Sequence, residues 1–227
     1  MKTRYTSGIA FICEGETEQI FYERLIYHFH ALNQEYSYQN NLFDDKDNDY
    51  YSVATSDSQS VLIKMKTIGT VTQMTHAAQW FNNICRGKQQ GLRWTVFLCY
   101  DTDTYQEDIS KFYEEDWKIL RKKLSGRNID IIDLSASAMI EDLFLYDRQG
   151  ICNFLQIPEQ DIPYVGNGKN TLKHFFRQHG QTYHEGERAR NLIWSLDIEL
   201  ISQQAQIQLS KVGDLCFPYA KKRNMDI

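Results

Sequence analysis

Two acidic clusters, far apart in the sequence, have the residue types and spacing of a divalent-metal site. Glu14, Glu16 and Glu18 follow the apolar run SGIAFIC, and Asp101 and Asp103 follow the end of WTVFLCY. Residues two apart on an extended chain project to the same side, so both aspartates can direct their carboxylates at one point. Carboxylate oxygens are preferred ligands of Mg²⁺, which is commonly bound by one or two of them together with water and phosphate.

Each cluster alone also has an ordinary structural explanation. Acidic residues at a helix start complement the helix dipole, and an Asp after a strand is common turn chemistry. Two such clusters brought together would repel each other unless a cation lay between them. Ligands of parallel α/β sheets bind beyond the carboxyl ends of the strands, which is where both clusters are expected. The sequence therefore predicts one metal site shared by the two clusters.

The neighbouring segments predict the elements that position these residues. An apolar run at 8–13 predicts a buried strand, and from Thr17, a candidate N-cap, the apolar residues follow helical spacing. Residues 33–52 are polar and rich in tyrosine, and they predict a long loop or insertion. The same patterns predict further strands at 94–101 and 129–135 and helices at about 71–86, 112–124 and 138–147.

This order of elements predicts an α/β fold with a mostly parallel sheet and helices on both faces, because long connections favour parallel strands. After about residue 150 the pattern changes to a loop with two of the three prolines, followed by two predicted helices at 170–179 and 186–203. We therefore expect an α/β domain over residues 1–150 and a helical C-terminal lobe over residues 151–227 that packs on it.

The composition limits the class of protein. A net charge of -5 over 227 residues excludes a generally basic nucleic-acid coat. The five cysteines form no CxxC pair, which favours a reduced compartment over a disulfide framework. No segment approaches the roughly 20 apolar residues of a membrane span, and nothing at the N-terminus reads as a signal peptide. We expect a cytoplasmic protein without a membrane partner.

Taken together, the two clusters resemble the signature of the Toprim domain. CEGETE is similar to an EGxxE motif, and YDTD supplies a DxD motif at the end of a later strand. The Toprim domain is shared by topoisomerases, bacterial primases, ribosomal-RNA maturases and the overcoming-lysogenization-defect (OLD) nucleases. The EGxxE form is similar to that of the OLD-type and RloB-like branch. The resemblance covers residues 8 to about 148 and implies a Toprim-like, Rossmann-like fold.

The resemblance implies roles for individual residues by position. Glu14 matches the glutamate with a general acid/base or metal role, and Glu18 matches the second acid of EGxxE. Asp101 and Asp103 match the metal-binding pair. In the nuclease branch a further metal-binding acid follows the next strand, and Glu141 is the nearest candidate.

Three other residues receive weaker or different assignments. Asp142 is the alternative to Glu141, and it projects about 100° away on a helix. Lys169 is the candidate for the downstream lysine that neutralises phosphate in the family, although it could equally be an ordinary surface lysine. Glu16 is predicted to point away from the metal and to tolerate substitution.

The function implied by the resemblance is cleavage of a nucleic-acid phosphodiester with Mg²⁺ or Mn²⁺ as cofactor, in phage defence or nucleic-acid processing. The expected partners are DNA or RNA, together with a protein partner such as an ATPase subunit. A group of basic residues and histidines in the C-terminal lobe could contact phosphates, or could form an ordinary solvated helix face. The members of this group are Lys169, Lys173, Arg177, Arg188, Arg190, His174, His179 and His184.

Two other functional classes remain open at the level of the sequence. DTDT at 101–104, followed by Tyr105, resembles the DxDxT opening of haloacid-dehalogenase-type phosphatases, in which the first Asp is the nucleophile and the second a general acid. That hypothesis leaves CEGETE unexplained. The third class is a non-catalytic, metal-binding Toprim-like module within a larger complex.

Overall fold

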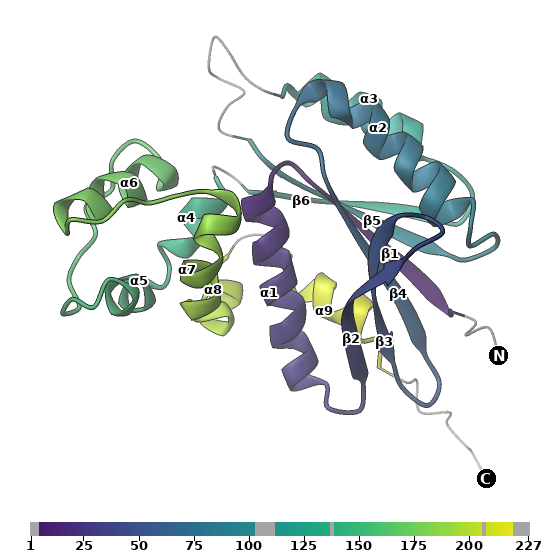
Figure 1. Ribbon diagram of the computed structural model, residues 1–227, viewed down its shortest axis with the longest axis horizontal. Coiled ribbons are helices and arrows are strands. Elements are labelled where there is room, and N and C mark those ends of the chain that lie inside the picture. Colours follow the sequence, from purple (N-terminus) through teal and green to yellow (C-terminus); the bar gives the residue numbers. More distant parts are fainter. Residues whose placement is uncertain (1–4, 103–111, 137–138, 206–207, 220–227) are drawn as a thin grey trace.

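The structure is a computed structural model that describes residues 5–102, 112–136, 139–205 and 208–219. Its centre is a six-stranded sheet with the order β2-β3-β4-β1-β5-β6 (Figure 1). The strands β1 (Ser7–Cys13), β4 (Ser60–Thr67), β5 (Trp94–Asp101) and β6 (Ile129–Ala136) run parallel, and β2 (Ser37–Asp44) and β3 (Asp49–Thr55) form an antiparallel hairpin at one edge. The predicted α/β fold with a mostly parallel sheet is therefore confirmed.

Helices cover both faces of this sheet (Figure 1). α2 (Val71–Trp80), its π-helical continuation (Phe81–Arg86) and α3 (Glu114–Leu124) cover one face, and α1 (Glu16–Leu32) covers the other. Successive residues of β1 enter opposite cores, since Phe11 belongs to the core around α1 and Ile12 to the core around α2 and α3. Burial on both sides explains why this strand is apolar at nearly every position.

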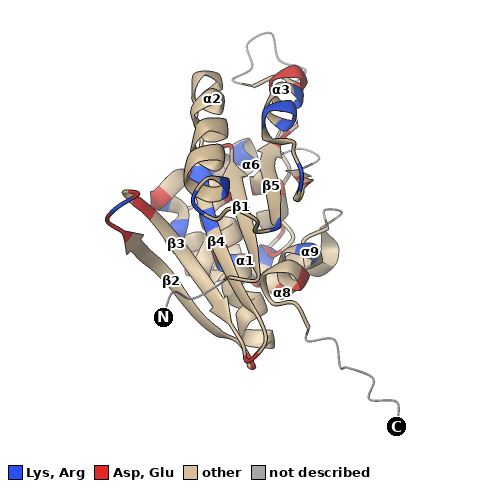
Figure 2. Cartoon of the chain, turned by 90° about the vertical axis from the view of Figure 1, so that its right-hand side faces the viewer, with Lys and Arg blue, Asp and Glu red and all other residues tan. Residues whose placement is uncertain are grey.

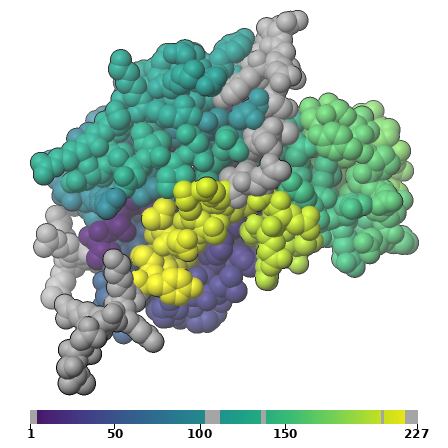
Figure 3. Space-filling view, turned by 180° about the vertical axis from the view of Figure 1, so that it is seen from behind, coloured from purple at the N-terminus to yellow at the C-terminus, as the bar shows by residue number. Residues whose placement is uncertain are grey.

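The C-terminal third of the chain is helical and packs along α1. Side chains from these helices share one core with β1 and α1, and Figure 3 shows the last of them lying over α1. The helices are α4 (Ile140–Phe144), α5 (Arg148–Phe154), α6 (Gly168–Gln178), the 3-10 helix η3 (Gly186–Ala189), α7 (Arg190–Ser195), α8 (Ile198–Gln204) and α9 (Ser210–Cys216).

The predicted loop at 33–52 is wrong, because most of this segment forms β2 and the first part of β3. Its polar composition is explained by position: exposed and half-buried residues alternate along β2, which lies at the sheet edge. The register of the hairpin is irregular between Gln39 and Leu42, and Asn41 adopts a left-handed conformation. The strand β4 next to the hairpin was not predicted.

Several helix boundaries also differ from the prediction. The single helix expected at 186–203 is divided into η3, α7 and α8, and α5 and α9 were not predicted. Thr17 is not the N-cap of the first helix. α1 begins at Glu16 with Gly15 as the N-cap, and the Thr17 hydroxyl accepts a hydrogen bond from the backbone N–H of Gly186 instead.

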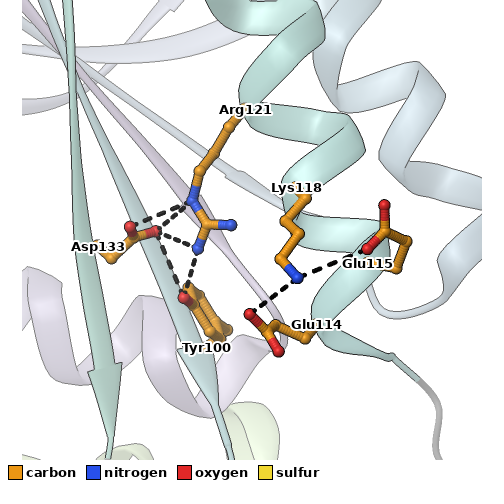
Figure 4. Close-up of polar contacts among 6 residues, drawn as sticks. All are labelled: Tyr100, Glu114, Glu115, Lys118, Arg121 and Asp133. Atoms are coloured by element: carbon orange, nitrogen blue, oxygen red, sulfur yellow. Dashed lines mark hydrogen bonds and ion pairs between the residues drawn. The ribbon is translucent and has the colours of Figure 1, made fainter.

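The end of β5 is fixed against α3 by an aromatic and ionic cluster (Figure 4). The Tyr100 ring stacks on Trp117 with 4.2 Å between the ring centroids. Arg121 donates to the Tyr100 hydroxyl at 2.6 Å and forms an ion pair with Asp133 of β6 at 2.8 Å. These contacts hold β5, β6 and α3 together one residue before Asp101.

The distribution of charged residues along α3 also stabilises this helix. Three acidic residues, Glu114, Glu115 and Asp116, lie in its first turn, and three basic residues lie in its last (Figure 2). This arrangement complements the helix dipole at both ends.

The orientation of α3 leads to a prediction about stability. Trp117 is fully buried, whereas Ile119 on the same helix is 48% exposed. We expect Trp117→Ala to lower the free energy of unfolding by about 3–5 kcal/mol and Ile119→Ala to lower it by less than about 1 kcal/mol. Urea unfolding followed by circular dichroism measures both changes. Equal losses in the two variants would contradict this orientation.

Candidate metal and phosphate site

The two acidic clusters meet at one edge of the sheet. β1 and β5 are neighbouring parallel strands in which Cys13 pairs with Cys99, so the residues that follow them emerge side by side. The backbone N–H of Glu14 donates to the Cys99 carbonyl at 2.8 Å. In return, the Glu14 carboxylate accepts the backbone N–H of Asp101 at 3.2 Å. The first acid of each cluster is therefore in direct contact with the other cluster.

A cavity of about 590 Å³ opens at this edge, and most of the predicted site residues line it. They are Glu14, Glu18, Asp101 and Glu141, together with Lys169. Glu16, which was predicted to point away from the metal, also lines the cavity. Asp103 lies outside the described residues. The structure thus brings the acids of EGxxE, the first acid of DxD and two distant residues to one place, while their roles in binding a metal stay predictions.

Burial strongly perturbs the pKa of Glu18. The residue is buried, and its carboxylate folds back over Gly15, where an added Cβ would lie 2.9 Å from Oε2. Burial raises the pKa of Glu18 to about 8, the charge of Glu14 adds to this rise and that of Glu141 contributes less. Backbone N–H groups at Glu18 and Gly15 oppose the shift. The metal-free site is therefore electrostatically unfavourable for a full set of ionised acids.

Glu141 enters the site from α4, which is tied to β5. The backbone N–H of Ile140 donates to Asp101 Oδ1 at 2.9 Å. The Tyr183 hydroxyl donates to Glu141 Oε1 at 2.9 Å. Burial raises the pKa of Glu141, and the hydrogen bond from Tyr183 opposes that rise. Asp142, the predicted alternative, accepts instead from the Met139 N–H and the Tyr164 hydroxyl.

The opposite side of the cavity comes from the start of α6. Gly168 packs directly against the backbone of α4, where a Cβ would lie 2.6 Å from the carbonyl carbon of Glu141 and would also meet the Asp142 nitrogen. This close approach brings Lys169 to the cavity. Its ammonium group lies 2.6 Å from Glu185, which also lies 3.4 Å from Lys173.

Sequence reasoning missed the segment of residues 183–187, here called the rim segment. Besides the contacts of Tyr183 and Glu185, the Gly186 N–H donates to Thr17 Oγ1 at 2.9 Å and the Glu187 N–H to Glu16 Oε2 at 3.4 Å. The sequence placed a helix start at 186 and named His184 as a candidate phosphate contact, but no motif connected Tyr183, Glu185 or Gly186 with the acidic cluster. Gly186 has a φ of 64°, in the left-handed region that favours glycine, so the residue type at this position is explained by the backbone conformation.

The predicted basic surface is already partly paired. Arg190 forms ion pairs with Glu23 at 3.0 Å and Glu187 at 2.7 Å, and it lies away from the cavity lining. His174 and His179 contact Gln178 and Gln160 respectively. Of the eight residues proposed to contact phosphate, Lys169 lines the cavity and Lys173 shares its carboxylate partner.

The acids that line the cavity are of the right chemical type to bind a metal ion, but their carboxylates do not point at one common position. In the described part of the chain, no group of three or more His, Cys, Asp and Glu side chains could hold a metal ion as it stands. The acids lining the cavity nevertheless have the oxygen chemistry that Mg²⁺ prefers, and their mutual repulsion would be relieved by a cation. Side-chain rotation within the cavity is therefore required for them to converge on one ion.

Neither models of known protein families nor the sequences of curated proteins match this chain. The functional assignment consequently depends on the residues and on the geometry of the site. Within the described ranges, no helix is long and apolar enough to cross a membrane.

The perturbed pKa of Glu18 predicts how stability changes with pH. Because this pKa is near 8 in the folded protein and 4.5 for an unperturbed glutamate, the folded protein binds more protons between these values. Stability is therefore lost as the pH rises through this window. In EDTA, we expect Glu18→Gln to raise the free energy of unfolding at about pH 9 by on the order of 2 kcal/mol, with little gain at about pH 5.

Glu16→Gln is the matched control, since Glu16 lies in the same helical turn but is exposed. Its pH profile, measured by urea unfolding, should follow that of the wild type. Parallel profiles for the wild type and Glu18→Gln would show that Glu18 is ionised in the folded protein at neutral pH.

Proposed function

We propose that this protein is a Mg²⁺- or Mn²⁺-dependent nuclease that cleaves phosphodiester bonds in DNA or RNA, with a Toprim-like active site. The observation that carries the proposal is the contact between the Glu14 carboxylate and the backbone of Asp101, which joins EGxxE and DxD at one cavity. The strand ends form the expected ligand position of a parallel α/β sheet. Lys169 adds a cation at the same cavity, as a phosphate substrate requires.

The acidic wall would hold the metal. We propose Glu14, Glu18, Asp101 and Glu141 as its ligands among the described residues, and Asp103 lies two residues after Asp101 in the sequence. A bound divalent ion supplies Lewis-acid stabilisation of phosphate charge and lowers the pKa of a coordinated water.

The remaining groups orient this wall and the substrate. The Ile140 N–H restrains the Asp101 carboxylate, and Tyr183 restrains Glu141. Lys169 would contact a non-bridging oxygen of the phosphate, because its ammonium group is a compact point charge on a flexible stem. Glu14 is the candidate for accepting a proton or binding the metal. Nucleic-acid processing or phage defence, with a partner such as an ATPase subunit, is the biological setting that we propose.

Substitution of the two contacting acids tests the proposed activity. We expect Glu14→Gln and Asp101→Asn to lower Mg²⁺- or Mn²⁺-dependent cleavage of single-stranded and duplex DNA and RNA by at least about a hundredfold, since each removes a charge from the reacting site. Gel analysis of labelled substrates measures the rates. Glu16→Gln, from the same cluster, should retain activity near that of the wild type. Equal cleavage by all four proteins would identify a contaminating nuclease.

Metal binding can be tested separately from cleavage. A ligand that binds only the folded state at a hundred times its Kd stabilises it by about 2.7 kcal/mol, so Mg²⁺ should raise the Tm of the wild type by several degrees over EDTA. Asp101→Asn should lose most of this shift, whereas Glu16→Gln should keep it. An equal Mg²⁺-dependent shift in all three proteins, measured by differential scanning fluorimetry, would place the ion elsewhere.

A phosphatase of the haloacid-dehalogenase type is the second candidate. Asp101 would be its nucleophile and Lys169 would stand for the lysine of that family, and both residues line the same cavity. That mechanism requires Asp101 as nucleophile and assigns no role to Glu14. Hydrolysis of p-nitrophenyl phosphate that is lost in Asp101→Asn but retained in Glu14→Gln would favour it. If neither substrate class is hydrolysed while the Mg²⁺-dependent shift persists, the non-catalytic metal-binding module is favoured.

A further inference from the structure

The rim segment places the carboxylate of Glu185 between two lysines beside the cavity. Glu185 Oε2 lies 2.6 Å from the Lys169 ammonium group, and Oε1 lies 3.4 Å from that of Lys173. Each oxygen of one carboxylate therefore faces a different cation. Two non-bridging oxygens of a phosphodiester, which also carry one negative charge in total, could make the same pair of contacts.

The backbone on either side of Glu185 is held by contacts that do not involve its carboxylate. Tyr183 donates to Glu141, and the Gly186 N–H donates to Thr17. Gly186 has a φ of 64°, and an added Cβ would lie 2.6 Å from Glu16 Oε2. The side chain of Glu185 can consequently leave the lysines, or be replaced, while the rim segment keeps its position.

The ion pairs themselves are weak enough to be exchanged. The side chains of Lys169, Glu185 and Lys173 are 26%, 43% and 45% exposed, so solvent screens their attraction. Exposed ion pairs contribute about 0–1 kcal/mol. The effect of the two lysines on Glu185 is nevertheless clear. Burial raises the pKa of Glu185, but the hydrogen bonds and charges of Lys169 and Lys173 together outweigh burial and lower it.

We propose that Lys169 and Lys173 form a subsite for a backbone phosphate of the nucleic acid, and that Glu185 occupies this subsite in the free protein and is displaced by substrate. The proposal rests on the proposed function for the identity of the substrate, and it adds Lys173 as a binding residue and Glu185 as an internal competitor. An internal competitor lowers affinity for any weakly held anion, so Glu185 selects for ligands that also gain contacts elsewhere in the cavity.

Binding measured without metal tests the subsite independently of cleavage. We expect Glu185→Gln to bind a short fluorescein-labelled single strand in EDTA about fivefold more tightly than the wild type at low salt, equivalent to about 1 kcal/mol. Because the freed lysines then release counterions on binding, the slope of log Kd against log salt concentration should steepen by about 0.7 for each lysine that gains a phosphate contact. Fluorescence anisotropy measures both quantities.

Glu187→Gln is the matched control, because it removes the same charge two residues away and leaves Arg190 paired with Glu23. Its affinity and salt slope should equal those of the wild type. Lys173→Gln in the Glu185→Gln background should remove most of the gain. The proposal is overturned if Glu185→Gln binds like the wild type, if Glu187→Gln shows the same gain, or if the double variant keeps it.

The outcomes separate this proposal from the proposed function. Tighter binding by Glu185→Gln without any metal-dependent cleavage by the wild type would support the subsite and reject the nuclease. Cleavage that depends on Glu14 and Asp101, together with unchanged binding by Glu185→Gln, would support the nuclease and reject the subsite. Equal Tm values for the wild type and Glu185→Gln verify that the rim segment has not been lost.

Discussion

The parallel pairing of β1 with β5 is the constraint on which the candidate site depends. It aligns Cys13 with Cys99 and so brings Glu14 and Asp101 out of the sheet at the same edge. A shift of one residue would turn the side chains of one strand to the opposite face. The apolar residues that fill both cores, such as Phe11 and Ile12, specify this register. Core packing and the geometry of the acidic cluster are therefore set by the same residues.

The fold tolerates an unfavourable charge arrangement at this edge. Glu18 is buried beside Glu14 and near Glu141, and the hydrogen bonds available to it do not offset burial and repulsion. Around this group the other acids are better accommodated, since Asp101 accepts from the Ile140 N–H and Glu141 from Tyr183. Strongly perturbed groups in a cavity are typical of functional sites, although ionic networks can also produce them.

The sequence was sufficient to predict three of the four parallel strands and the acids at the ends of β1 and β5, but not the buried strand β4. β1 and β5 are apolar along almost their whole length and β6 carries Ile129, Ile131, Ile132 and Leu134, so the positions of these strands were evident. Glu14, Glu18 and Asp101 followed from the strand-end rule. The edge hairpin was missed because one face of β2 is exposed and the other only half-buried, so its sequence is polar at most positions. Edge strands of this kind have the composition of a loop.

The rim segment could not be predicted, for a different physical reason. Its contacts with Thr17 and Glu16 depend on how α6 packs against α4, which in turn depends on the absence of a side chain at Gly168. Nothing in the local sequence of residues 183–187 encodes these distant partners. The acidic stretch at 14–18 was interpreted as a metal site or as an ordinary helix start, and neither interpretation included the contacts by which Glu16 and Thr17 hold another part of the chain.

This long-range anchoring has a consequence for synthesis of the protein on the ribosome. Thr17 and Gly186, which are joined by a hydrogen bond, are separated by 169 residues. Glu14 and Glu18 emerge early, but Lys169 and Glu185, which line the same cavity, are translated only after most of the chain. Domains generally fold as units during synthesis, and contacts of high sequence separation form late. A nascent chain therefore exposes the acidic stretch long before the lysine side of the cavity exists, and the complete cavity assembles only near the end of translation.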